Sequence, residues 1–135
     1  MKKYTITCDE VQLRLIADAV EDYSRLLSGQ CELNNMSLIL RPIKNIHKLE
    51  EIMREQVHPL VTPELPLNAS YSWNGGNCPN KIQRIAIAMG YGIYREIRHF
   101  FACQRTDNNW NCYKSETLRC PEQGELIQIK EIKEE

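Results

Sequence analysis

The longest periodic pattern in the chain lies in residues 80–101, where apolar side chains recur at steps of three, one or four. Such a stripe is typical of a helix that covers a core. Asn80 and Gln83 match a variant of the capping box at the start of this pattern. The same helix carries a second row, made of Arg84, Ile87, Tyr91, Tyr94 and Arg98. We therefore predict a central helix over residues 80–101 that contacts neighbours on two sides.

Two glycines, Gly90 and Gly92, interrupt this central pattern. Each costs a helix about 1 kcal/mol relative to alanine, so a glycine inside a helix usually has a packing or functional reason. One interpretation is close packing where a second helix crosses. The other is a kink that opens a pocket. We favour close packing.

Another helix is predicted near the N-terminus. Asp9 and Gln12 form a capping box, and Gly29 is a natural stop, so this helix covers about residues 10–28. Its apolar stripe is expected to face the core and consists of Leu13, Ile16, Ala17, Val20, Tyr23 and Leu27.

A third helix is expected from residue 46 to about residue 57. Asn45 is its predicted cap, and His58–Pro59 is its predicted end, because the residue before a proline avoids the helical conformation. Residues 31–40 remain open between a short helical turn and an irregular apolar link.

The two ends of the chain carry alternating patterns that are typical of strands. Residues 3–8 alternate between apolar and polar side chains, and residues 125–133 do so less regularly. Residues 110–113 are a further candidate for a short strand. The predicted fold class is α+β, with three main helices packed around the central helix 80–101 and a small sheet from the N-terminal and C-terminal strands. At 135 residues, the chain 1–135 is expected to be a single compact domain.

Composition excludes several classes of protein. No apolar run approaches the roughly 18 residues of a membrane span, and the N-terminus lacks the apolar core of a signal peptide, which predicts a cytoplasmic protein without membrane partners. The six cysteines lack the C-x2-C spacing of zinc or redox sites. We expect reduced, mostly buried thiols, and neither a metal nor a cofactor.

The best candidate for a binding site is a loop before the central helix. Residues 60–79 show no periodicity, and a loop of that length is often functional. Its distal part offers aromatic faces and flexible backbone, in Tyr71, Trp73, Asn74, Gly75 and Gly76. Two interpretations stay open: a structural loop closed by its own aromatic residues, which we favour, and a ligand site resembling an anion cradle.

The central helix offers a second candidate surface, which mixes aromatic and basic side chains: Tyr91, Tyr94, Arg95, Arg98 and His99. Binders of single-stranded nucleic acid use this mixture. Residues 81–119 carry a net charge of +4 between ends of −2 and −3. The favoured interpretation is that the tyrosines are half-buried and that the arginines pair with acids of residues 9–22 or of the C-terminal tail. No nucleophile motif is present, so we assign no catalytic residue.

Two stretches resemble a group of small uncharacterised proteins of bacteria and their prophages. They are the predicted strand followed by DEVQLRLIADAVEDYSRLLSGQ, and the later helix IAMGYGIYREIRHFF. The resemblance covers most of the chain and implies a bacterial or phage cytoplasmic setting, but no known chemistry.

The expected function is therefore a non-enzymatic interaction module. It would bind a protein partner, or itself as a homo-oligomer, through the aromatic–arginine row and the Trp73 loop. The alternative is a nucleic-acid-binding accessory protein that uses the same helix. A third hypothesis is a small enzyme or ligand-binding protein with its site in residues 73–77.

Overall fold

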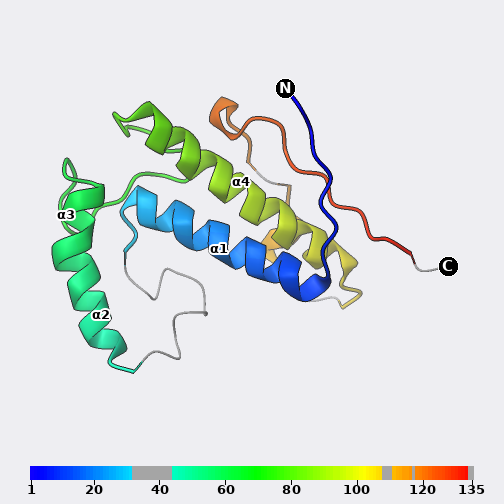
Figure 1. Cartoon of the computed structure of the whole chain (residues 1–135), viewed down its shortest axis with the longest axis horizontal. Helices are drawn as coiled ribbons and strands as arrows, with labels where there is room; N and C mark the ends of the chain where they lie inside the picture. Colours follow the sequence, from blue (N-terminus) through cyan, green and yellow to red (C-terminus); the bar gives the residue numbers. More distant parts are fainter. Residues whose placement is uncertain (32–43, 108–110, 117, 134–135) are drawn as a thin grey trace.

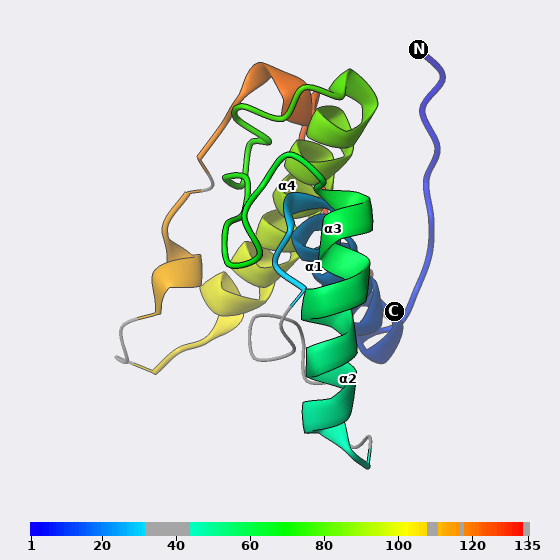
Figure 2. The same ribbon diagram turned by 90° about the vertical axis from the view of Figure 1, so that its left-hand side faces the viewer.

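Two long antiparallel helices form the body of the molecule in this computed structural model (Figure 1). The structure describes residues 1–31, 44–107, 111–116 and 118–133. Helix α1 spans Glu10–Ser28, and helix α4 spans Lys81–Gln104. A helical column crosses the end of this pair, where α1 ends and α4 begins (Figure 2). The column consists of α2 (Ile46–Ile52), the π-helical turn η3 (Met53–Val57) and α3 (His58–Val61).

The predicted helix starts are confirmed for both long helices. The Asp9 carboxylate accepts a hydrogen bond from Gln12 N at 2.8 Å, and the Gln12 side chain accepts one from Asp9 N at 2.9 Å. Gly29 ends α1 with φ +95°. Asn80 caps α4 through Gln83 N at 3.0 Å.

The Gln83 side chain connects three elements instead of completing a capping box. Its Nε2 donates to Leu27 O at 2.7 Å and to Val61 O at 3.2 Å. These two carbonyls lie near the ends of α1 and α3, where helix carbonyls lack partners within the helix. One amide therefore fixes where α1, α3 and α4 meet.

The predicted helix end at His58–Pro59 is wrong. The chain stays helical to Val61, and Pro59 lies in the first turn of α3 after the π-helical turn Met53–Val57. Proline is tolerated in a first turn because its missing N–H would lack a partner there in any case. The π-helical turn ends at Val57, so α3 begins at His58 and Pro59 lies in its first turn.

Small residues bring α1 and α4 close together. Ala17, Ser24 and Ser28 are the buried residues of α1. Ser24 Oγ donates to Ile87 O at 2.7 Å, and a Cβ added to Gly90 would lie 3.1 Å from Ser24 Cβ. A Cβ added to Gly92 would lie 3.2 Å from the Gln123 side chain on the other side of α4. Both glycines lie within a continuous α4, which supports the interpretation of close packing.

The predicted core face of α1 is partly wrong. Ala17 is buried, but Ile16 and Tyr23 remain 39 % and 56 % exposed. The helix is rotated so that its small polar residues face α4, and two of its large apolar residues lie outside. On α4, Ile87 and Tyr94 of the second row are buried. In the longer apolar stripe of the same helix, Ile97 is buried, but Ile82 and Met89 are exposed.

The predicted sheet is absent, so the α+β assignment is wrong for the part of the chain that the structure describes. Residues 1–9 and 124–133 form no helix or strand, and Tyr4 and Ile6 are exposed. The two end segments meet through a salt bridge between Lys3 and Glu125, at 2.8 Å between exposed side chains. Two strands alone are marginal in water, and a buried face is needed to stabilise them. The alternating pattern therefore predicted strands at the two chain ends, but the folded chain offers these segments no core to cover.

Some predictions lie outside the described residues. They concern most of the segment 31–40 and the start of the candidate strand 110–113. Residues 112–114 form a 3₁₀ turn, η4 (Cys112–Lys114), and a second such turn, η5 (Pro121–Gln123), follows it. Both turns pack against α4.

Candidate functional site

Four aromatic rings form a continuous row across the N-terminal loop of α4, α4 itself and η4. Trp73 lies 5.6 Å from Tyr91 between ring centroids, Tyr91 lies 5.7 Å from Tyr94, and Tyr94 lies 6.0 Å from Tyr113. We call Trp73, Tyr91, Tyr94 and Tyr113 the aromatic row. Three of the four rings were predicted site residues. Tyr113 was not, because no sequence signal relates η4 to a helix turn some twenty residues earlier.

Tyr94 belongs to the core and not to an exposed surface. It is 3 % exposed, and its hydroxyl shares a hydrogen bond with the Tyr113 hydroxyl. Burial, and then this hydrogen bond, raise the pKa of Tyr94 well above its ordinary value. Tyr91 and Trp73 are half-buried, so the row presents only partial ring faces to solvent.

Removing the Tyr113 hydroxyl is expected to lower the free energy of unfolding more than removing the Tyr94 hydroxyl does. Tyr113→Phe leaves the buried Tyr94 hydroxyl without this partner and should lower the free energy of unfolding by about 2 kcal/mol. Tyr94→Phe leaves the half-buried Tyr113 hydroxyl, which water can reach, and should cost about 1 kcal/mol. Urea denaturation of both variants measures the difference. Equal losses would contradict the burial of Tyr94.

The loop before α4 is held by contacts to both long helices and by hydrogen bonds within the loop. Tyr71 is buried, packs with Cys78 and Ile87, and donates its backbone N–H to Ser28 O at 2.7 Å. Asn74 Oδ1 accepts a hydrogen bond from Gly76 N at 2.9 Å. Gly75 alone of the two adjacent glycines has positive φ, at +69°. These contacts support the interpretation of a structural loop.

Three basic side chains of the predicted site, Arg95, Arg98 and His99, have partners within the chain. Arg98 Nη2 lies 2.6 Å from Asp18 Oδ1 on α1. The Arg95 guanidinium lies over the Tyr113 ring at 4.8 Å. His99 Nδ1 donates to Tyr113 O at 2.8 Å, since a carbonyl oxygen can only accept. The Arg98–Asp18 pair is the pairing with acids of residues 9–22 that the sequence favoured.

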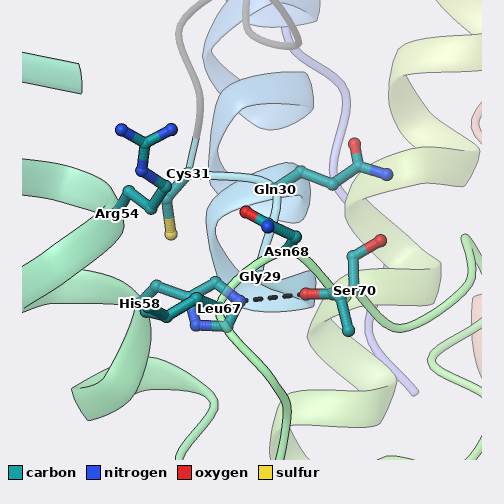
Figure 3. A pocket seen from close by; sticks show the side chains of 9 residues that line it. Gly29, Gln30, Cys31, Arg54, His58, Leu67, Asn68 and Ser70 are labelled. Carbon is teal, nitrogen blue, oxygen red and sulfur yellow. Dashed lines mark hydrogen bonds between the residues drawn. The ribbon is translucent and has the colours of Figure 1, made fainter. Parts of the chain in front are cut away.

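A polar pocket of about 140 Å³ lies where α1 ends beside α3 and the loop 67–70 (Figure 3). His58 is 1 % exposed, and its Nε2 donates to Ala69 O at 2.9 Å, the bond drawn in Figure 3. Burial raises the pKa of the neighbouring Cys31 thiol, which keeps it protonated. The Cys31 thiol is therefore a weak nucleophile in this pocket.

An apolar surface, absent from the predicted site, extends over both long helices. The Arg98–Asp18 pair marks one flank of the helix pair. Residues that lie about half a turn away from Asp18 on α1 and from Arg98 on α4 point to the opposite flank, and the apolar residues among them share that flank. We call these residues the apolar flank: Ile16, Ala19 and Tyr23 of α1, with Ile82, Met89, Ile93 and Phe100 of α4. The carboxylate of Glu96 lies on the same stripe of α4, between Ile93 and Phe100. Ile82 and Met89 are 81 % and 43 % exposed. An exposed surface of this kind usually marks an interaction site.

The chain has no significant match among protein-family models, curated proteins or solved structures. Among the described residues, no helix has the length and apolar character needed to cross a membrane. No group of three or more His, Cys, Asp or Glu side chains suited to a metal ion occurs within these residues.

Proposed function

We propose that this chain is a protein-interaction module that self-associates through the apolar flank. The observation that supports this most is the placement of large apolar side chains outside the α1–α4 interface. Ile16 and Tyr23 are exposed although small residues of the same helix are buried. Burying such side chains contributes about 1.5–3 kcal/mol each when burial is complete.

A second copy of this chain fits the flank better than a charged partner would. The core of an interface is depleted of charged residues, and homodimer interfaces are more apolar than transient ones. The charged side chains Glu21 and Arg25 of α1 pair with each other at 2.9 Å, away from the flank. In a twofold dimer, each copy would present the same flank to the other.

Nucleic-acid binding receives less support from these contacts. Arg98 pairs with Asp18, and Arg84 lies 3.7 Å from Glu122. Arginines that are already paired neutralise fewer phosphates, so fewer counterions leave the nucleic acid on binding and the gain in affinity is smaller. From the resemblance to small bacterial and prophage proteins, we infer that the protein acts in the bacterial cytoplasm.

Adding a charge to the flank is expected to weaken self-association. Ile16→Glu and Met89→Glu should each raise the dimer dissociation constant at least about tenfold, equivalent to about 1.4 kcal/mol, because the carboxylate would have to be desolvated. Analytical ultracentrifugation over a concentration series measures this constant. Gln56→Glu is the matched control, since it adds the same charge at an exposed position of η3.

Two outcomes would contradict the proposal. One is a wild-type protein that stays monomeric up to millimolar concentration. The other is a dimer that Gln56→Glu weakens as much as Ile16→Glu does.

A further inference from the structure

The polar pocket between the end of α1, η3 and the loop 67–70 has room for a small molecule. Its volume of about 140 Å³ is many times the roughly 10–15 Å³ that one water molecule needs. Figure 3 shows Arg54 on one side of the pocket and Gln30 and Ser70 on the other. Arg54 and Ser70 are exposed, so the pocket opens to solvent. None of its lining residues belongs to the apolar flank, so the two surfaces are separate.

Hydrogen bonds hold the loop side of this pocket in place. His58 is 1 % exposed, and its Nε2 donates to Ala69 O at 2.9 Å. Tyr71 N donates to Ser28 O at 2.7 Å. A Cβ added to Gly29 would lie 3.1 Å from Ala69 O, so the glycine lets the loop approach the end of α1. A ligand would therefore enter a formed pocket, and little of its binding free energy would go into ordering the loop.

The opposite wall belongs to the π-helical turn η3. Turns of this kind are rare, and they occur frequently at functional sites. Here the turn carries Arg54 and leads directly into His58, so one short segment supplies both the charged wall and the group that holds the loop.

The pocket offers few acceptors to a cation. The last carbonyls of α1 lie beside it, but each already accepts a hydrogen bond from another group of the chain. They are the carbonyls of Arg25, Leu26, Leu27 and Ser28. Among the described residues that line the pocket, none carries a carboxylate.

The polar groups that remain are mainly donors. Gln30 Oε1 accepts from Arg25 Nη1 at 2.5 Å, which leaves the Nε2 hydrogens of Gln30 for a ligand. The side chains of Asn68 and Ser70 make no hydrogen bond within the described part of the chain. A guanidinium has five N–H donors, so Arg54 can keep its partner within the chain and still donate to a ligand. This set of donors matches an anion with several acceptor oxygens.

We propose that this pocket binds a phosphate group, either as the free ion or on a small molecule. A guanidinium can hold phosphate through two parallel N–H···O bonds, which are roughly twice as strong as bonds between neutral groups. Arg54 donates to the phosphate in this way, and Gln30, Asn68 and Ser70 donate to its other oxygens. Phosphate offers more acceptor oxygens than a carboxylate does, which suits donors from several side chains.

The test is a titration of the ¹⁵N-labelled full chain with inorganic phosphate and with glycerol 3-phosphate at constant ionic strength. We expect the side-chain amide signals of Gln30 and Asn68 to shift and saturate, while those of Asn74, outside the pocket, stay in place. Tighter binding of glycerol 3-phosphate would assign the site to a phosphorylated small molecule, and equal or weaker binding would assign it to the free ion. Shifts that never saturate, or that are as large for Asn74, would overturn the proposal.

Two variants with matched controls test the charge of the pocket. Arg54→Gln removes the positive charge and Ser70→Asp adds a negative one, so each should raise the phosphate dissociation constant at least about tenfold. Lys48→Gln and Ser115→Asp make the same charge changes at exposed positions outside the pocket, where screening should limit the effect to less than about twofold. Thermal unfolding without phosphate checks that all four variants fold. A folded pocket variant that binds phosphate as tightly as its control would refute the site.

Discussion

Replacing Gly75 by alanine is expected to lower the free energy of unfolding by about 3 kcal/mol. Gly75 has φ +69°, a conformation that costs an L-residue with a side chain roughly 1–2 kcal/mol. A Cβ at this position would also lie 2.8 Å from Arg84 O and 2.9 Å from Arg84 Cα. These are backbone atoms inside α4, so they cannot move aside as a side chain can. Urea denaturation followed by circular dichroism measures the loss.

The adjacent glycine provides the matched control. Gly76→Ala introduces a Cβ that meets only the ends of the Asn74 and Ser72 side chains, and φ at Gly76 is not positive. We expect a loss below about 1 kcal/mol, as for most surface substitutions. In Gly75→Ala, displacement of the loop should also separate Trp73 from Tyr91 and change the tryptophan fluorescence. Equal losses in the two variants would show that Gly75 does not approach α4 as described.

The second large effect is expected from Gly90→Leu, which should also cost about 3 kcal/mol. A Cβ at Gly90 would lie 3.1 Å from Ser24 Cβ and 3.2 Å from Val20 O. Leucine favours a helix by roughly 0.5–1 kcal/mol over glycine, so any loss arises from the interface and not from helix propensity. The longer side chain would separate α1 from α4 and break the hydrogen bond from Ser24 to Ile87 O.

A graded series makes this prediction specific. Gly90→Ala should change stability little, because the gain in helix propensity of about 1 kcal/mol offsets the tight contact. Met89→Leu, at the exposed neighbouring position, should stay within about 0.5 kcal/mol of the wild type. A Gly90→Leu variant as stable as Met89→Leu would refute close packing at this crossing.

Local signals predicted the two long helices well. The Asp9–Gln12 capping box, the Asn80 cap and the positive φ of Gly29 depend on residues within one or two turns of each other. Such contacts can be read from spacing alone. The same reasoning predicted a helix end at Pro59, which is wrong. Whether a proline ends a helix or begins a new turn depends on the hydrogen bonding of the preceding turn.

The candidate site was predicted only in part. Sequence reasoning selected Trp73, Tyr91 and Tyr94, and the structure brings these rings together. It missed Tyr113, since η4 reaches α4 through contacts between distant parts of the chain. It favoured half-buried tyrosines on this helix, whereas Tyr94 is fully buried, because periodicity does not say which of two stripes faces the neighbouring helix.

The sequence by itself determined where α1 and α4 begin, because caps and periodicity act within a few residues. Only the tertiary structure decided which faces are buried. Ser24 and Gly90 bring the helices close enough for backbone contact, and this rotates Ile16 and Tyr23 outward. The ends of the chain likewise follow tertiary structure, because a strand needs a partner and a core, and alternation supplies neither. The glycines indicated close packing from the sequence, but which residues they meet, and which face of each helix turns inward, are properties of the folded chain as a whole.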